Sequence, residues 1–421
     1  ETLFYMLSGM VDTLMLSAVG DYAVGAVGTA NSYIGIFIIM FSIISSGMVS
    51  VMTQNIGAGR PGVAYQARQL GLLFNAVAGV LMAVFLFSGA GAILRMVGIA
   101  DALYEPALIY LKIVGGGCIL NAVIPIFSSY LRAFGYTKQP LYATIVGNIA
   151  NFVMNAVFLF VLHKGVAGVA AATVISKILN LCIVLYFSHK LISAKNSTER
   201  IANKTVLGQI VKVGLPSACE TALYNVAMML VIRFLNQMDA EGLNVTARSY
   251  TATISNFSYC VGAALAQANA IMTGWHIGAG ELEECDRGTK RAAFVGVCVA
   301  VCMETAIVLG SGFIMPLFTD NPEMTALVRK LLAIDIVLEI GRVTNLVFGQ
   351  ALKTSGDAVF PAVIAAVFMF VFAVGGTWLF GISMGLMAVG AYIGLASDEC
   401  VRAVGMVWRW KTGKWRTKKL V

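Results

Sequence analysis

The chain has 421 residues, of which 59% are hydrophobic and only 12% are charged. Soluble domains carry about twice that share of charge, so the composition excludes an ordinary soluble enzyme, a disordered protein and a nucleic-acid-binding protein. The net charge of +8 lies in short loops and in the C-terminal tail, not on an amphipathic surface. With a mean hydropathy of +0.83, the length predicts a polytopic membrane protein of about 12 helices.

Twelve apolar segments can be marked in chain order, and they are too long for the strands of a membrane barrel. They cover residues 1–20, 26–55, 66–96, 105–131, 139–162, 166–189, 207–236, 244–275, 288–317, 324–352, 357–381 and 385–408. Because Glu1 already stands inside the first segment, we expect the natural N-terminus to be truncated.

A polar stretch separates the first six segments from the last six. We therefore expect an N-terminal lobe at 1–189, a cytoplasmic linker at 190–206, a C-terminal lobe at 207–408 and a basic cytoplasmic tail at 409–421.

An internal repeat relates the two halves. Ile56-Gly-Ala-Gly59 recurs 221 residues later as Ile277-Gly-Ala-Gly280, and the Leu, Gly and Pro of 131–140 recur at the same offset in 352–361. Each copy holds six spans, an even number, so both halves enter the membrane from the same side. The sequence thus predicts an all-α membrane protein of 12 transmembrane helices in two pseudo-symmetric six-helix lobes.

Loop charge predicts the orientation. The repeated loops, the linker and the tail hold 19 Lys and Arg residues, whereas the opposite loops hold only Lys164. The positive-inside rule places the charged side and the C-terminus in the cytoplasm of a plasma (inner) membrane. We expect Trp408, Trp410 and Trp415 to lie at the membrane interface, next to anionic lipid.

No cofactor is predicted. The eight Cys are scattered without His partners and indicate neither disulfides nor a metal site. Phosphate-loop and hydrolase motifs are missing from the sequence, so we expect H+ or Na+ as the coupling ion and no ATP chemistry.

Several short motifs occur in a fixed order: Val11-Asp-Thr-Leu-Met-Leu-Ser-Ala-Val-Gly20, Ala26-Val-Gly-Thr-Ala-Asn31, Gln54-Asn-Ile-Gly-Ala-Gly59, Leu131-Arg-Ala-Phe-Gly135, Asn151-Phe-Val-Met-Asn155 and Gly214-Leu-Pro-Ser217. Together they resemble the multidrug and toxic compound extrusion (MATE) transporters over essentially the whole chain. The resemblance implies two six-helix lobes and antiport of organic, often cationic, compounds against H+ or Na+.

Asp12 is the leading ion-coupling candidate. It lies about 12 Å below the outer end of its span, and a carboxylate at that depth costs roughly 2.5–3.5 kcal/mol, which favours a functional role. In similar transporters the Asp of this motif is the ion-coupling residue of the N-lobe. Asn148, Asn151 and Asn155 share one helix face. They could serve Asp12, water or a ligand, or equally fasten two helices together.

Further candidates for the substrate or the central cleft are Lys177, Glu220, Tyr224 and Asn148. Lys177 either pairs with Asp12 or fills a polar cavity. Glu220 is either a counter-charge for a cationic substrate or an acid bonded beside carbonyls that Pro216 leaves free. Tyr224 stands where one branch of the family has a coupling Glu.

In the tenth span Asp335, Glu339 and Arg342 follow one stripe of the helix. We interpret Glu339 and Arg342 as a structural ion pair, because an unpaired charge there is very costly. Glu304, in the ninth span, has no evident local partner.

We therefore predict a secondary efflux transporter, not an enzyme, that works by alternating access on organic, cationic or amphipathic compounds. The alternatives are a lipid-linked oligosaccharide flippase of the same superfamily, which would want cations lining its cleft, and a membrane-embedded enzyme, which would need clustered His or paired acids. Expected partners are a small organic molecule and membrane lipid, with no nucleic acid, and the chain is expected to be a monomer.

Overall fold

The computed structural model describes residues 2–17, 19–96, 99, 101–192, 199–239 and 242–421, and within them every regular element is helical. The chain forms two compact units. Unit 1 comprises Glu1–Ile56 and Arg60–Gly214, and unit 2 comprises Gly57–Gly59 and Leu215–Val421.

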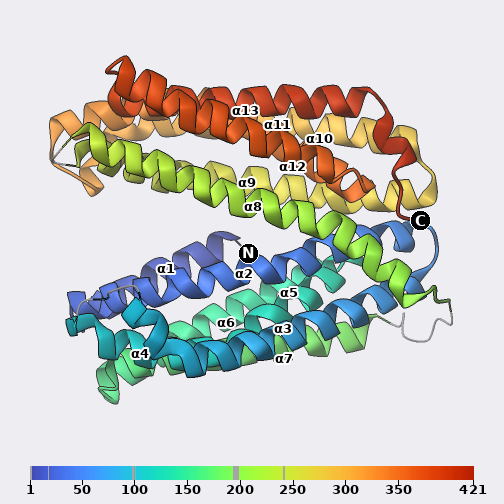
Figure 1. Ribbon diagram of the computed structural model, residues 1–421, viewed down its shortest axis with the longest axis horizontal. Coiled ribbons are helices and arrows are strands. Elements are labelled where there is room, and N and C mark those ends of the chain that lie inside the picture. Colours follow the sequence, from blue (N-terminus) through green and yellow to red (C-terminus); the bar gives the residue numbers. More distant parts are fainter. Residues whose placement is uncertain (1, 18, 97–98, 100, 193–198, 240–241) are drawn as a thin grey trace. The chain divides into compact units, whose positions relative to one another are not determined.

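Unit 1 is a bundle of long helices around an apolar core that includes Leu86, Leu94 and Leu111 (Figure 1). Its elements are α1 (Thr2–Ser17), α2 (Asp21–Gly57), α3 (Pro61–Met96), α4 (Asp101–Gly116), α5 (Cys118–Ala133), α6 (Lys138–Ala156), the π-helical turn η1 (Val157–Val161), α7 (Gly165–Leu191) and the start of α8 (Asn203–Met238).

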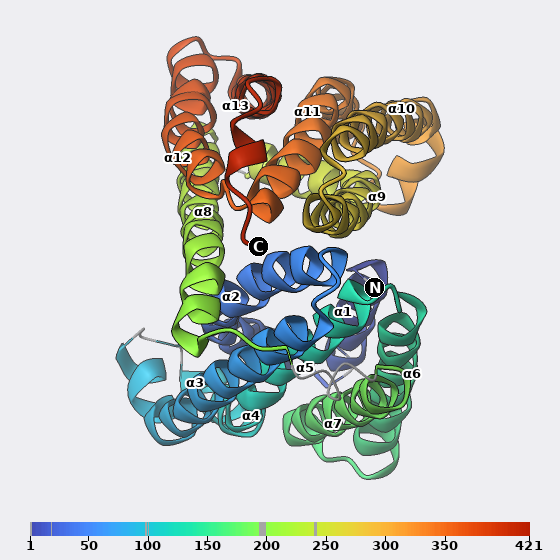
Figure 2. The same ribbon diagram turned by 90° about the vertical axis from the view of Figure 1, so that its right-hand side faces the viewer.

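In unit 2, α11 packs against α9, α10 and α13, as the end-on view of Figure 2 shows. After α8 the elements are α9 (Leu243–Ala279), α10 (Leu282–Ile314), the 3-10 turn η3 (Met315–Leu317), α11 (Pro322–Ser355), α12 (Val359–Phe368), the π-helical η4 (Met369–Val374) and η5 (Thr377–Ser383), α13 (Met387–Lys411) and the 3-10 turn η6 (Lys414–Thr417).

The repeat seen in the sequence has a counterpart in the backbone. Gly135 and Gly356, which are equivalent by the 221-residue offset, both have positive φ angles, of 85° and 98°, where a helix has just ended. Only glycine adopts this conformation freely, so each repeat keeps it at the same turn. The π-helical stretches η1 and η5 are also equivalent by this offset.

The apolar segment expected as one span at 105–131 is broken. α4 and α5 meet at Gly117 with a bend of 41°. The run Gly115-Gly116-Gly117 explains the break, because consecutive glycines weaken a helix. The equivalent helix of unit 2, α11, is continuous.

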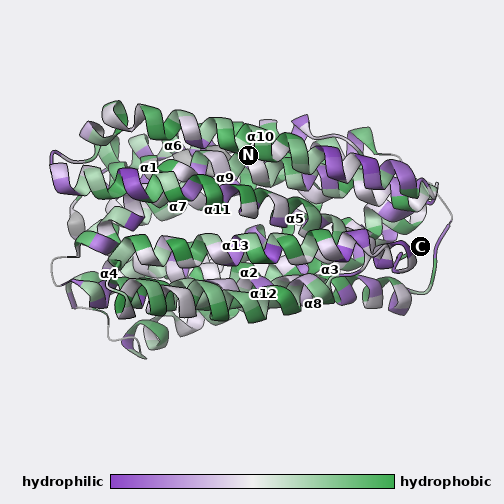
Figure 3. Ribbon diagram, turned by 90° about the horizontal axis from the view of Figure 1, so that it is seen from above, coloured by the Kyte–Doolittle hydropathy of each residue, from purple (hydrophilic) through white to green (hydrophobic). Residues whose placement is uncertain are grey.

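Within the described residues, seven helices are long and apolar enough to cross a membrane, and the bent pair α4–α5 would make an eighth. Hydrophobic residues dominate the length of the helices in Figure 3. α1, α9, α11 and α13 do not meet this criterion. α1 has only 16 residues, α9 is rich in Ser, Thr and Asn along its length, and α11 and α13 carry buried acids and Arg402 toward the interior of unit 2.

The expectation that three tail tryptophans lie at the membrane interface is wrong for two of them. Trp410 and Trp415 are each only 1% exposed, and their rings stack with centroids 4.2 Å apart. The Trp415 indole N–H also donates to the Trp410 carbonyl at 3.0 Å. The chain turns back after α13, so burying two large apolar rings outweighs leaving them at the surface. Trp408 alone of the three is exposed, at 59%.

Candidate functional site

In unit 1 the structure brings Asp12 and two of the predicted asparagines together. Asn155 Nδ2, on α6, donates to Asp12 Oδ1 at 2.6 Å and to Asn151 Oδ1 at 3.2 Å. Asn151 and Asn155 are buried, whereas Asp12 is partly buried. Among the described residues, Asn155 Oδ1 has no hydrogen-bond partner. The arrangement thus offers carboxylate and amide oxygens to a proton or a small cation.

Asn148 has a different use. Its Nδ2 donates at 2.9 Å to the carbonyl of Phe4 in α1, so here it fastens α6 to α1 and does not face Asp12. This contact corresponds to the helix-fastening role that polar side chains commonly have in membranes.

Lys177 lies on α7, and its Nζ donates to Asn121 Oδ1 of α5 at 2.8 Å. It is near enough to Asp12 to interact with it electrostatically, but its hydrogen bond goes to the amide. Of the two predicted roles, the contact fits a polar interior better than a direct ion pair. Sequence reasoning had missed Asn121, which lies on another helix.

Unit 2 contains a cavity of about 570 Å³ between α8, α9, α11 and α13. Glu220 and Tyr224, two of the predicted cleft residues, line it. Glycine brings two of its walls close together, because a side chain on Gly341 of α11 would come within 2.7 Å of the Cys400 nitrogen of α13. This close approach places the charged residues of the two helices within reach of one another.

The charges around the cavity are paired in large part. Lys353 contacts Glu220 at 2.8 Å, and Arg402 contacts Asp398 and Glu399, each at 2.7 Å. Glu220 therefore has a cationic partner, which sequence reasoning missed because Lys353 is on α11 and Glu220 on α8.

Arg342 makes the contact with Glu339 that their spacing predicts. It also lies 4.0 Å from Glu399 of α13 and faces the ring of Tyr259, 5.7 Å from its centroid. The predicted pair thus belongs to a larger buried network.

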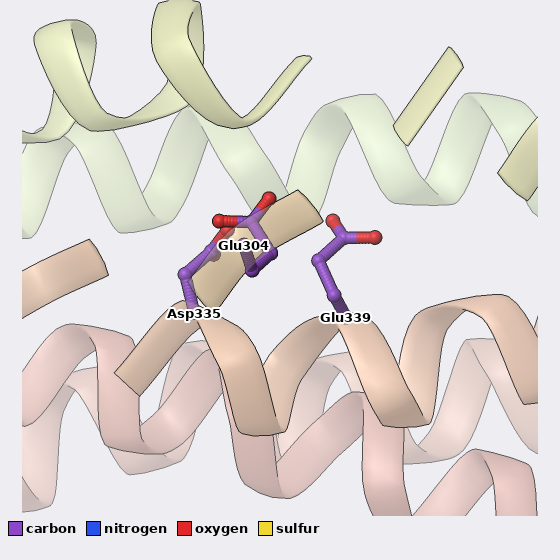
Figure 4. Close-up of side chains that lie close together, drawn as sticks. All are labelled: Glu304, Asp335 and Glu339. Atoms are coloured by element: carbon purple, nitrogen blue, oxygen red, sulfur yellow. The ribbon is translucent and has the colours of Figure 1, made fainter. Parts of the chain in front are cut away.

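Beside this network three carboxylates gather around one point (Figure 4). Glu304 of α10 meets Asp335 and Glu339 of α11, with one oxygen of each within 4.8 Å of the others. Their exposed fractions are only 0%, 3% and 0%. The i, i+4 spacing of the two α11 acids was visible in the sequence, but nothing there placed Glu304 opposite them. Such a group of oxygens could hold a cation.

Known proteins are similar to this chain over nearly its whole length. A family model described as MatE matches residues 1–157 and 216–379. The uncharacterized transporter YisQ of Bacillus subtilis (strain 168) is 32% identical, across 99% of this chain and 93% of its own length. The probable multidrug resistance protein NorM of Thermotoga maritima is 20% identical, across 100% of this chain and 91% of its own.

Among solved structures, a crystal structure of MATE in the straight conformation has a TM-score of 0.87 and 21% identity, covering 98% of this chain and 93% of that one. A transporter of the MOP superfamily from Pyrococcus furiosus has a TM-score of 0.83 and 20% identity, with coverage of 99% and 93%. These likenesses confirm the predicted fold of 12 transmembrane helices in two lobes. Because the family model and YisQ each match most of its length, the chain belongs to the MATE family, whose members are multi-pass membrane transporters and not enzymes.

Proposed function

We propose that this transporter exports organic, cationic or amphipathic compounds by antiport against H+ or Na+, in the plasma (inner) membrane with its C-terminus in the cytoplasm. The observation that carries the proposal is the contact between Asp12 and Asn155. It gives a carboxylate in the first span a fixed amide donor, and Asn155 Oδ1 beside it has no hydrogen-bond partner among the residues that the structure describes.

Asp12 suits ion coupling because its two states differ by a full charge at a partly buried site within a membrane span. With the ion absent, the carboxylate is held by Asn155, and Lys177 compensates part of its charge. When a proton or Na+ binds, that charge is neutralised. In the proposed alternating-access cycle, the outward-facing state takes the ion at Asp12 and releases substrate. The inward-facing state then accepts substrate from the cytoplasm or the inner leaflet. The multidrug name of the Thermotoga maritima relative is in keeping with such substrates.

The flippase alternative has less support. A protein that holds the anionic headgroup of a lipid-linked sugar would want free cations in its cavity. Four Lys and Arg residues line the cavity of unit 2. Of these, Arg342, Lys353 and Arg402 are each in contact with an acid. Only Arg248, which contacts Met228, has no ion pair among the described residues.

The test is Asp12→Asn in proteoliposomes with an imposed H+ or Na+ gradient. Asparagine keeps the size and the hydrogen bonding but can neither titrate nor carry charge. We expect the variant to insert normally and still bind a fluorescent cationic dye, while gradient-driven efflux falls by about tenfold or more, the scale of a typical coupling free energy.

The matched control is Asp101→Asn, which removes the same charge from an exposed site at the start of α4 and should leave efflux unchanged. Efflux by Asp12→Asn at the parent's rate under both gradients would refute the coupling role.

A further inference from the structure

We propose that Glu304, Asp335 and Glu339 form a second cation site, in unit 2, built for a hard divalent metal ion such as Ca2+. This site is separate from Asp12 and does not depend on the coupling role proposed for it. Asp335 and Glu339 project from α11 on one side, toward Glu304 of α10 (Figure 4).

The spacing of the oxygens suits a hard cation. Ca2+ binds oxygen ligands at about 2.3–2.6 Å, so two oxygens on opposite sides of the ion lie about 5 Å apart. One oxygen from each of the three carboxylates lies within 4.8 Å of the other two. A single ion could therefore contact all three without displacing a helix.

Two serine hydroxyl groups next to the acids also indicate a bound ligand. Ser258 of α9 lies beside Glu304, and Ser255 lies beside Asp335. Both serines are at least 97% buried. In the described part of the chain, neither serine hydroxyl has a partner at hydrogen-bond distance and angle. Both carboxylate oxygens of Glu304, and one oxygen each of Asp335 and Glu339, also have no such partner there.

Each buried polar atom left unpaired costs about 1–3 kcal/mol. So many of them around one point is unusual, and a bound cation would satisfy them together. Hydroxyl and carboxylate oxygens are also the ligand types that hard cations prefer.

The charge of the site favours a divalent ion. When all three carboxylates are ionised they carry three negative charges, and Arg342, which contacts Glu339, offsets one. Arg402 is already shared between Asp398 and Glu399. The two remaining charges must be neutralised in the interior, either by protons on the acids or by a bound cation that displaces those protons. One divalent cation balances them.

The site also has an entrance. Ser255, Asp335 and Arg342 all line the cavity of unit 2, whereas Glu304 does not. An ion would thus enter from the cavity past Asp335 and meet Glu304 at the far side of the site. An entry path of this kind is among the features a metal site needs.

The experiment measures binding of radioactive 45Ca2+ to the purified, chelator-treated transporter in detergent, without Na+. We expect about one ion bound per chain in the parent and at least about tenfold weaker binding by Glu304→Gln. Ser258→Ala, which removes no charge, is the second variant and should weaken binding by a smaller factor. Elution as a single sharp peak in size-exclusion chromatography establishes that each variant is folded.

Two controls keep the outcomes distinct. Glu323→Gln removes an exposed acid from the first turn of α11, and Asp12→Asn removes the proposed coupling acid of unit 1; both should bind Ca2+ as the parent does. The proposal is overturned if the parent binds no Ca2+, if Glu304→Gln binds as tightly as the parent, or if only Na+ or protons occupy the site. Loss of binding in Asp12→Asn would instead place the ion at Asp12. A failure of the Asp12 transport test leaves this result untouched.

Discussion

Arg342 is the residue on which the charge balance of unit 2 depends. It contacts Glu339 of α11, lies 4.0 Å from Glu399 of α13 and faces the ring of Tyr259 of α9. Removing a cation that serves several buried acids leaves the charges of those acids without compensation. Removing one of the acids is less severe, because the guanidinium keeps the others.

This asymmetry gives a prediction. Arg342→Gln should destabilise the protein by about 3–5 kcal/mol, the range for breaking a buried ion pair, and Glu339→Gln should destabilise it by less. The double variant should be more stable than the sum of the two effects implies. Thermal unfolding in detergent measures all three, and strictly additive effects would argue against the pair.

At the scale of elements, the segment after α13 is a structural part of unit 2. Trp410 and Trp415 are buried in the same apolar cluster as Phe348 and Leu352 of α11. Polar contacts add to this packing: Arg409 Nε contacts Asp357 Oδ2 at 2.7 Å, and Arg416 reaches Glu283 of α10 at 2.7 Å. Both apolar packing and ion pairs therefore fix the turn η6 and the end of α13 against the rest of unit 2.

Trp415→Ala should destabilise the protein by about 3–5 kcal/mol, the usual cost of truncating a buried Trp. Trp408→Ala is the matched control, since it removes the same side chain from an exposed position seven residues earlier, on α13, and it should cost far less. The melting temperatures of the two variants in detergent test this. Equal shifts would mean that the segment contributes no packing.

For the whole molecule, the distribution of basic residues predicts which end of each lobe faces the cytoplasm. In a variant whose exposed cysteines are replaced by serine, Arg287→Cys in the α9–α10 region should react with an impermeant maleimide only after the cells are permeabilised. Lys164→Cys, in the opposite set of loops, should react in intact cells. Both positions are exposed. The reverse labelling pattern would invert the topology.

The helical repeat could be predicted from the sequence, because glycines at a fixed offset mark turns where the backbone needs a positive φ angle. It also predicted pairs on one helix, such as Glu339 with Arg342, since the helical period fixes which side chains are neighbours. It could not place Glu304 opposite Asp335, or Lys353 beside Glu220, because those contacts depend on how separate helices pack. The buried Trp415 was missed for a similar reason, as only tertiary packing distinguishes it from an interfacial Trp.

The stacked indoles have an optical consequence. All five tryptophans of the chain, at 275, 378, 408, 410 and 415, belong to unit 2. Intrinsic tryptophan emission therefore originates entirely in the C-terminal half, and Asp12 sits in a half that contains no such chromophore. Two parallel indoles 4.2 Å apart couple their electronic transitions, so the near-ultraviolet circular dichroism of the protein should carry a signature of that one contact. Tryptophan fluorescence and near-ultraviolet circular dichroism of the indoles therefore report on the C-terminal lobe and not on the N-terminal lobe.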